Sequence, residues 1–447
     1  MLRRIGISPH TSRCARALRP RAAGAMPVLR AAARIQPSYG SIQQRGKSTL
    51  TKILLEDSWR TIGLVFGIAF IASGIGYVGY VTFFGASTIY PKEERNMLRK
   101  AGRLYRCAPE NQDLPKAIEY YTKALANLDK LGEEDPMHAR DAHHITGLVA
   151  RIAEVYAEMG DLDKAIEMYT DFMQRILDEE RIKDPKLLVG ELLDKGLPAN
   201  RQQNIQRALG CANKLAEAYE MRSARSKRRT AVLPSAAKAS EEDEQAANRW
   251  YQWCLQLVTL TYLKDYNAWL AEHRKPAVKE PPFDPDTLPK CFLAEEVASL
   301  FYNAATFFNR NGQPQLGAPL LMRALDLLDY GADGREKSVC RSSIILSHLA
   351  NAAVETGDLP AAEKWTIEGL RLAKKFRENA ECLSSFIALA YDLGAVYEAA
   401  GMVDSARVQY RHVNVVAKAA GDSEAERLAA AGLDRMSAAA QPDSKKT

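Results

Sequence analysis

The sequence predicts an all-α protein in which stacked helix hairpins form a solenoid, preceded by a single transmembrane helix. Three observations support this fold class. Beyond Pro91 apolar residues recur at intervals of three and four, one spacing signature recurs along the chain, and an uncharged stretch precedes both. The chain has 447 residues, of which 47% are hydrophobic and 26% are charged. This composition is typical of globular proteins and excludes disorder over most of the chain.

Residues 1–47 have the composition of a mitochondrial transit peptide. The first 55 residues contain eleven Lys and Arg and no acidic residue, and the first carboxylate is Glu56. No apolar core follows the first charges, which disfavours a secretory signal; a disordered basic arm is the alternative. Because the whole chain has a net charge of +6, the remainder is acidic, and its charge gives no support for nucleic-acid binding.

Residues 62–84 are predicted to span a membrane, with residues 48–61 before them as a matrix-side juxtamembrane segment. The 23-residue stretch has no charged side chain and would cover about 34 Å as a helix, enough for a hydrocarbon core of about 30 Å. Gly63 and Gly67 form a G-x-x-x-G pattern and are candidates for packing against another membrane helix. The Lys and Arg residues before the span favour the matrix for the N-terminus. A buried helix of a soluble domain is the alternative.

Residues 92–435 are predicted to form six helix hairpins. In the clearest copies of the signature, residues 152–169 and 393–410, a small residue, an aromatic, a Gly, an Ala and a second aromatic follow at fixed intervals. The Gly and a following Asp, as in Gly160-Asp161, would end one helix and cap the next. Small residues allow the two helices to approach closely, and stacking covers the apolar face of each hairpin. An irregular helical bundle is the alternative.

This spacing resembles the tetratricopeptide repeat (TPR). The six copies have these residues at the first aromatic position: Tyr105, Tyr156, Tyr219, Phe308, Ala353 and Tyr397. Two segments interrupt the pattern. A basic run followed by an acidic run near 222–246 predicts a flexible surface loop, with lipid binding as an alternative role, and five Pro near 273–290 predict an extended loop. Residues 436–447 are predicted to form a disordered tail.

No residue pattern predicts catalysis, a cofactor or a metal ion. The seven cysteines are scattered without a C-x-x-C or twin C-x9-C pattern, so we expect mostly free thiols packed as small hydrophobic groups. His138, His143 and His144 lie near acidic residues, but they lack H-E-x-x-H spacing, and a polar loop explains them better. We find no nucleophile with a base and an orienting group, so the sequence predicts a protein that is not an enzyme.

In TPR arrays the first helix of each hairpin lines a concave groove, so inward-facing side chains are candidates for polypeptide binding. With Tyr156 as the eleventh position of its repeat, positions five and nine of each first helix face inward. The candidate peptide-groove residues are Arg99, Arg103, Glu154, Asn213, Glu217, Tyr302, Thr306, Ser347, Asn351 and Tyr391. Family members that bind chaperone tails use a clamp containing Lys, whereas these positions carry none, and Glu154 and Glu217 would repel a carboxylate. A polypeptide of mixed polarity fits better. The alternative is that some of these positions pack against the next hairpin.

The order of these parts, with residues 89–95 after the span and residues 415–421 after the last repeat, resembles the fungal Mgr3-like proteins of the mitochondrial inner membrane. That resemblance implies an adaptor of the i-AAA protease, which binds unfolded or misassembled substrate proteins and assists their delivery for degradation. The implied partners are AAA-protease subunits, unfolded proteins and the bilayer, with the TPR domain in the intermembrane space. A TPR assembly factor for a respiratory-chain complex is the alternative. The Arg-rich presequence argues against an outer-membrane import receptor.

Overall fold

The computed structural model describes residues 89–106, 112–194, 196–230, 235–275, 288–328 and 336–439. These residues form helices joined by turns and contain no strand, which confirms the all-α prediction for this part of the chain. None of the described helices is both long enough and apolar enough to cross a membrane. The predicted transit peptide, juxtamembrane segment and span, including Gly63 and Gly67, lie outside the described residues.

The chain divides into two compact units after Ala139. In the smaller unit, α3 (Lys92–Arg106) and α4 (Leu114–Leu131) form one hairpin, and the short helix η3 (Pro136–His138) follows. Fully buried alanines on both helices allow close packing. Glu94 is also buried, and its carboxylate accepts a hydrogen bond from the Asn127 amide of α4 at 3.1 Å, so the hairpin has a polar tie as well as an apolar interface.

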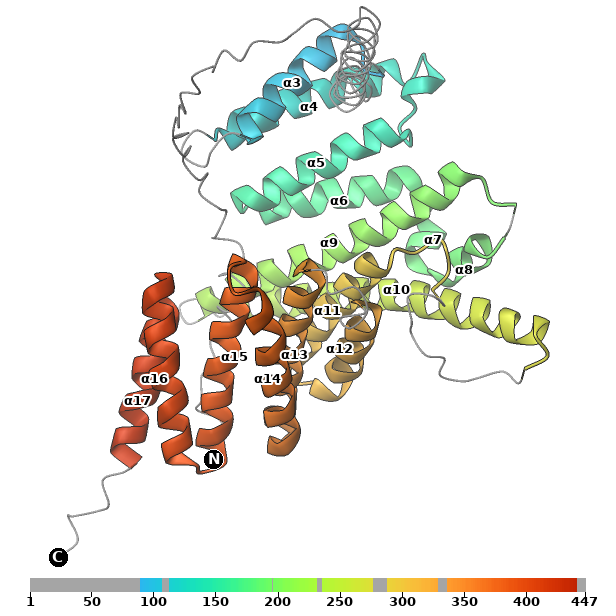
Figure 1. The fold of residues 1–447 in the computed structure, drawn as a ribbon. Coiled ribbons are helices and arrows are strands. Elements are labelled where there is room, and N and C mark those ends of the chain that lie inside the picture. The colour runs from blue at the N-terminus through green and yellow to red at the C-terminus, as the bar shows by residue number, and fades with distance from the viewer. Residues whose placement is uncertain are drawn as a thin grey trace, which may run out of the picture. The chain divides into compact units, whose positions relative to one another are not determined.

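The larger unit contains five further hairpins and a final unpaired helix, shown in order along the chain in Figure 1. The helices are α5 (His143–Met159) and α6 (Leu162–Ile176); α9 (Ala199–Thr230) and α10 (Ser235–Glu272); α11 (Ala294–Arg310) and α12 (Pro314–Leu328); α13 (Glu336–Thr356) and α14 (Leu359–Ala373); α15 (Ala380–Ala399) and α16 (Val403–Ala420); and α17 (Ser423–Ala439). Each second helix contacts the first helix of the next hairpin, and successive first helices also touch. Together with α3–α4, these hairpins coincide with the six copies of the sequence signature. The described helices therefore form TPR-like hairpins, stacked as a solenoid in the larger unit.

The tight turns follow the predicted chemistry. Gly160 and Gly357 adopt left-handed φ values of 81° and 82°, which favour glycine because a Cβ would be strained there. The next residues, Asp161 and Asp358, accept hydrogen bonds from backbone amides in the first turn of the following helix. The glycine thus ends the first helix, and the aspartate starts the second.

The predicted loop at 222–246 is wrong, because α9 continues to Thr230 and α10 begins at Ser235. The basic run lies on α9 and the acidic run on α10, and the antiparallel helices bring the two runs together. Arg222 donates hydrogen bonds to both carboxylate oxygens of Asp243, at 2.7 to 3.1 Å. Lys227 forms an ion pair with Glu244. Opposite charges therefore join the two helices, and Arg222 and Lys227 of the basic run are paired with carboxylates.

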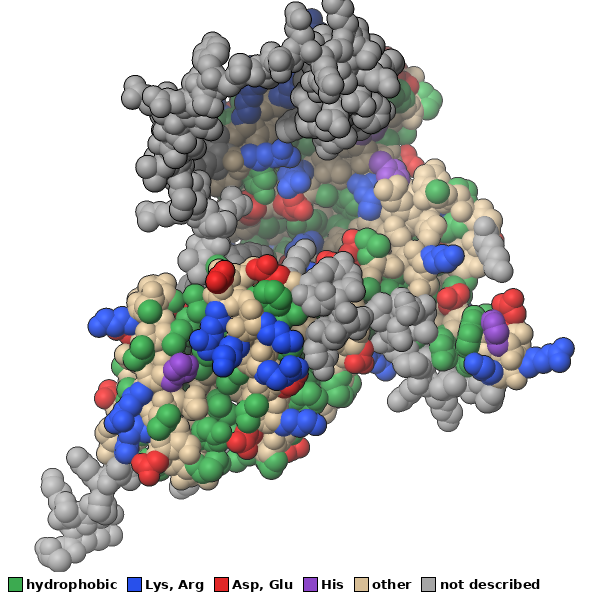
Figure 2. Space-filling model, in the orientation of Figure 1, with side chains coloured by type: hydrophobic (Ala, Val, Ile, Leu, Met, Phe, Trp, Pro, Cys, Tyr) green, Lys and Arg blue, Asp and Glu red, His purple; other side chains and the backbone are tan. Residues whose placement is uncertain are grey.

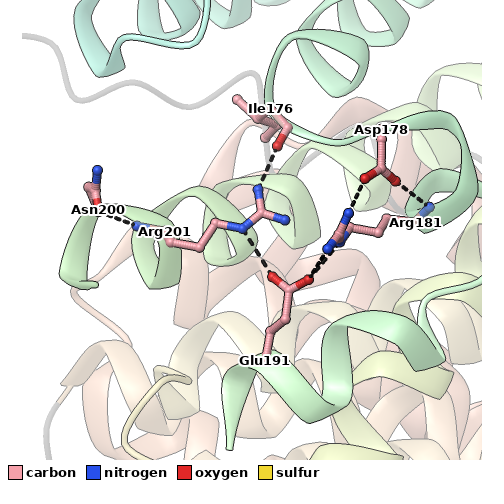
Figure 3. A network of polar contacts seen from close by, with 6 residues as sticks. All are labelled: Ile176, Asp178, Arg181, Glu191, Asn200 and Arg201. Carbon is pink, nitrogen blue, oxygen red and sulfur yellow. Dashed lines mark hydrogen bonds and ion pairs between the residues drawn. The ribbon is translucent and has the colours of Figure 1, made fainter. Parts of the chain in front are cut away.

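Two short helices between α6 and α9 were not predicted from the sequence: α7 (Glu179–Lys183) and α8 (Lys186–Leu192). They are too short to show a helical period. Figure 3 shows how they are held. Glu191 of α8 binds Arg181 of α7 at 2.6 Å and Arg201 of α9 at 3.0 Å. Arg201 also donates to the Ile176 carbonyl at the end of α6, at 2.9 Å, so one carboxylate and one guanidinium join four helices.

The segment predicted as an extended loop near 273–290 is described only at its ends. α10 ends at Glu272 and α11 begins at Ala294, while residues 276–287 lie outside the described residues. Just before α11, Cys291 is buried, and its carbonyl accepts a hydrogen bond from the Gln206 amide of α9. This contact fixes the start of the fourth hairpin.

The C-terminal helix extends further than predicted. Residues 436–439 belong to α17, and Met436 is only 4% exposed, so the predicted tail does not begin at 436. The reason is a packed aromatic: fully buried Tyr410 lies between Gly394 of α15 and Gly432 of α17, where an added Cβ would come within 2.8 Å of the ring. α17 thus occupies the place that the first helix of another repeat would take.

The expectation of mostly free thiols is wrong for two cysteines. Cys340 of α13 and Cys382 of α15 form a disulfide across a sequence separation of 42 residues. Cys211, Cys254 and Cys291 are free and buried. This bond could not be predicted from the sequence, because the partners lie on successive first helices and their spacing follows the repeat length rather than a local motif.

Candidate polypeptide-binding surface

Two candidate groove residues lie in the smaller unit. Arg99 and Arg103 are on α3, four residues apart, and both are exposed. Residues at this spacing share one face of a helix. This face of α3 can therefore contact an acidic or polar ligand.

In the larger unit, the position-five side chains are engaged between hairpins. Three of them, Asn213, Tyr302 and Ser347, contact the position-six side chain of the next first helix. The hydrogen bonds are Asn303 Nδ2 to Asn213 Oδ1 (3.4 Å), Tyr302 Oη with His348 Nε2 (3.0 Å) and Ser347 Oγ to Asp392 Oδ2 (2.6 Å). The same offset of one residue therefore recurs at three successive junctions: α9–α11, α11–α13 and α13–α15. We call this set the five–six ladder.

A second set of polar contacts keeps the same one-residue offset, now between positions twelve and thirteen. Glu220 of α9 pairs with Arg310 of α11 at 2.5 Å, and the hydroxyl of Tyr251 donates to the same carboxylate at 3.2 Å. The equivalent group recurs at the end of the array. Glu398 of α15 binds Arg435 of α17 at 2.8 Å and accepts a hydrogen bond from Tyr410 at 2.6 Å. We call these two groups the Glu–Tyr–Arg triads.

Burial controls the ionisation of the five–six ladder. It lowers the pKa of His348 to about 4, with a further contribution from the Arg310 charge, so this imidazole is neutral at pH 7. Burial raises the pKa of Asp392 to about 7, although the hydrogen bond from Ser347 opposes this, and it raises the pKa of Tyr302 to about 12. Burial thus favours the uncharged forms of these groups, which suits a packed junction between helices. Their hydrogen bonds set the register of the junction.

The candidate groove residues therefore separate into two groups. Asn213, Tyr302 and Ser347 belong to the five–six ladder, and Tyr391 packs against the Tyr410 ring at a centroid distance of 5.4 Å. At position nine, Thr306 is buried and contacts its own helix and Arg310. The alternative, packing against the next hairpin, describes where Asn213, Tyr302 and Ser347 lie.

The remaining position-nine side chains are half-buried at the edge of the face. Glu154 pairs with Arg151 of its own helix at 2.7 Å, and Glu217 accepts hydrogen bonds from Lys214 at 2.8 Å and Asn303 at 2.6 Å. Asn351 of α13 is also half-buried. Their polar atoms are partly accessible to solvent on the first helices.

Sequence reasoning missed position thirteen, which is exposed on all five first helices of these hairpins. The residues are Glu158, Met221, Arg310, Glu355 and Ala399. Met221 is 37% exposed although it is a large apolar side chain. The residue at position two is also small and exposed on several of the same helices, as at Gly147, Gly210 and Ser299. The signal was available, because position thirteen lies one helical turn beyond position nine and so shares its face. We call positions two, nine and thirteen the first-helix face.

The first-helix face can recognise a polypeptide but offers no assembled catalytic set. Its side chains are carboxylates, a guanidinium, an amide, a thioether and small residues, which provide hydrogen bonds, charge and apolar contact along successive helices. Among the described residues, no group of three or more His, Cys, Asp or Glu could hold a metal ion. Extended contact over several repeats is the mode of binding that such a surface supports.

No family model matches this chain, and no curated protein matches it. Solved structures with related repeats do match. BtubC (BKLC) from P. vanneervenii is 16% identical, with 75% of this chain and 96% of that chain covered and a TM-score of 0.38. A Podosopora anserina putative kinesin light chain with nearly identical TPR-like repeats is 15% identical, with 61% and 94% covered and a TM-score of 0.34. The S. pombe nuclear import adaptor Nro1 is 12% identical, with 76% and 99% covered and a TM-score of 0.36.

Proposed function

We propose that this protein is a non-catalytic adaptor that binds unfolded or misassembled proteins on its first-helix face and delivers them to the i-AAA protease of the mitochondrial inner membrane. The observation that carries the binding step is the constant one-residue offset between first helices. At three junctions it engages position five with the next first helix, and position thirteen is exposed on five successive first helices. A surface built by repetition can hold an extended chain without a pocket shaped for one ligand.

Delivery requires that the adaptor and the protease lie in the same membrane. The proposal assigns this to the predicted span at residues 62–84, with the N-terminus in the matrix and the repeats in the intermembrane space. Tethering raises the local concentration of a bound client near the protease, which increases degradation without any change in the chemistry of cleavage. The Mgr3-like order of segments supports this choice of protease.

The disulfide supports a location outside reducing compartments. Cys340 and Cys382 form it between two first helices, and disulfides persist where thiols are not kept reduced. Protease treatment of intact mitochondria and of mitoplasts tests the topology. We expect the repeats to be protected in the first and digested in the second. Digestion in intact mitochondria would place the repeats in the cytosol and contradict the proposal.

Affinity purification in mild detergent tests the partner. The tagged protein should recover the AAA protease in near-stoichiometric amount, and deletion of the protein should slow turnover of its clients. Recovery of respiratory-chain subunits without the protease, with loss of one complex on deletion, would instead establish an assembly factor. The two outcomes differ in the recovered proteins, so a single preparation decides between them.

Binding on the first-helix face has its own test. Glu158→Lys combined with Glu355→Lys reverses two exposed charges at position thirteen, and Met221→Ser removes the exposed thioether. Client recovery should fall while protease recovery stays unchanged. Glu167→Lys on α6 is the matched control, because it reverses one exposed charge on a second helix, which is not part of this face. Equal client recovery by all variants would place client binding elsewhere.

A further inference from the structure

The outer face of α16 carries a stripe of exposed side chains. Arg411, His412 and Val415 lie three, four and seven residues after Val408, so the four share one side of the helix. The opposite side is formed by the buried residues of α16, which are Ala406, Tyr410, Val413 and Ala417.

The two valines have no role in the packing of the array. Val415 is 67% exposed and Val408 is 60% exposed. A β-branched residue on a solvent-facing helix also loses side-chain freedom and so lowers helix propensity. Exposed apolar side chains at a seven-residue interval form the ridge with which one helix packs against another.

Basic side chains surround this stripe. The Arg377 guanidinium lies 3.7 Å from the centre of the Phe386 ring, and the same ring forms a T-shaped pair with the His412 imidazole, with the ring centres 5.8 Å apart. Phe386 therefore joins the segment after α14 to the outer face of α16. Lys374 and Lys375 are exposed in the same segment, in the short helix η4 (Lys374–Phe376).

Figure 2 shows Lys and Arg side chains gathered over the region of α14 to α16, with hydrophobic side chains beside them. The acidic groups in the same segment are Glu378, which is exposed, and Glu381, which is half-buried in the first turn of α15. Four cations, Lys374, Lys375, Arg377 and Arg411, thus lie near these two carboxylates and Glu368 of α14, which is already paired with Arg371. None of the four forms an ion pair within the described part of the chain, so the local charge is positive and open to a partner.

We propose that this surface, formed by Val408, Arg411, His412 and Val415 with Lys374, Lys375 and Arg377, binds an amphipathic, acidic helix of a partner protein. The valines, about 10.5 Å apart along α16, match apolar residues one heptad apart on the partner helix. The cations match carboxylates on its flanks. The surface lies on the second-helix side of the hairpin, so it is separate from the first-helix face, and the inference does not rest on the proposed function.

A helix fits this surface better than a bilayer or a second copy of the chain. The apolar part is a narrow stripe with two valines and no Trp or Tyr, the residues that favour the membrane interface. A second copy would need to present an acidic, apolar helix face. Both alternatives give outcomes that the following experiment distinguishes.

The test measures binding of two synthetic helical peptides of 21 residues to the detergent-solubilised full chain by fluorescence anisotropy. Both peptides carry Leu at heptad spacing; one has Glu and the other Lys at the remaining surface positions. The acidic peptide should bind at least tenfold more tightly. Arg377→Glu with Arg411→Glu should weaken it at least tenfold, and Val408→Ser with Val415→Ser at least fivefold. Lys123→Glu and Ile367→Ser, at other exposed positions, should bind as the parent does.

Four results would overturn the proposal: similar affinity for both peptides, binding of neither, binding that is unchanged by both double variants, or weaker binding by the control variants too. Flotation with anionic vesicles that depends on Arg377 and Arg411 would assign the surface to lipid. A dimer in sedimentation that is lost on Val415→Ser would assign it to a second copy. Helicity of each variant by circular dichroism shows that the substituted proteins are folded.

Discussion

The junction between α9 and α11 and the junction between α15 and α17 contain the same triad of Glu, Tyr and Arg, yet the two carboxylates differ in pKa. Burial raises the pKa of Glu220, and the charge of Arg310 and the Tyr251 hydrogen bond only partly compensate. Glu398 is also partly buried, but hydrogen bonds from Arg435 and Tyr410 outweigh that burial and lower its pKa. The repeat thus determines which residue types form the triad. Solvent exposure and hydrogen-bond geometry at each junction determine the pKa of the carboxylate and so its contribution to stability.

The difference follows from the position of each triad in the array. Arg435 binds Glu398 with two nitrogens, at 2.8 Å each, in a bidentate arrangement. Arg310 divides its contacts between Glu220 and the Thr306 carbonyl, at 3.1 Å from the latter. In the described part of the chain no hairpin follows α17, which is attached by its contacts with α16 and α15, this ion pair among them.

The largest expected effect concerns the tyrosines of the two triads. Tyr410→Ala and Tyr251→Ala each empty a fully buried site, and large-to-small changes of buried aromatic residues cost about 3–5 kcal/mol. Chemical unfolding should show a similar loss for both. Hydrogen exchange should separate them: Tyr410→Ala should expose only α17 and its contacts, whereas Tyr251→Ala should increase exchange on both sides of α10. If hydrogen exchange increased equally throughout the chain in both variants, the array would not be held together by contacts between neighbouring hairpins alone.

The disulfide gives the next effect. Cys340→Ala removes a cross-link that closes a loop of about 42 residues, which is worth about 3–4 kcal/mol by loop-closure entropy. The melting temperature should fall, and a reducing agent should lower that of the parent protein but not that of the variant. Cys254→Ala is a control, because this buried cysteine is free. A parent protein that is insensitive to the reducing agent would mean that the cross-link is not formed.

The opposite pKa directions predict opposite responses of stability to pH. Because the pKa of Glu398 is lowered, its contribution exists above the unfolded value of about 4.5 and is lost as the pH falls. Glu398→Gln should therefore cost about 1–2 kcal/mol at pH 7 and little at pH 3. For Glu220 the pKa is raised, so its contribution exists at low pH and is lost as the pH rises. The stability of the Glu220→Gln variant relative to the parent should therefore increase from pH 4 to pH 7. Parallel pH profiles for the two variants would contradict the comparison.

The smallest effect concerns the five–six ladder. Burial raises the pKa of Asp392 from 3.8 to about 7, so the protonated form is favoured in the folded state, and the parent loses this contribution as the pH rises from about 4 to 7. Asp392→Asn keeps an acceptor for Ser347 and cannot ionise. Its stability should vary less than that of the parent over this interval. The same slope in both proteins would show that Asp392 does not titrate there.

The repeat signature was sufficient to predict all six hairpins, because Gly-Asp turns and small residues act locally. It was not sufficient for α7 and α8, which are too short to show a period, nor for the helices at 222–246. There the basic and acidic runs looked like a solvated loop, since only the antiparallel partner reveals their pairing. The Cys340–Cys382 bond was missed for the same reason: its partners meet only through stacking.

The candidate groove shows the same limit. Periodicity placed Tyr302 and Ser347 on a first helix correctly, but their orientation depends on the offset between helices, which no single repeat contains. Pairs such as Tyr302 with His348 and Ser347 with Asp392 carried a usable signal, because each is a complementary donor and acceptor one position apart in successive repeats. Position thirteen could have been found by extending the exposed face by one turn.

The most direct test of the account uses a photo-crosslinking residue at position 221 on the first-helix face or at position 367 on the outer face of α14. Met221 and Ile367 are both exposed, so the two sites are matched in access. Clients are trapped in mitochondria in which the membrane protease is catalytically inactive. We expect crosslinks to unfolded clients from position 221 and few from position 367. Equal crosslinking from both positions, or crosslinking from 367 alone, would contradict client binding on the first-helix face.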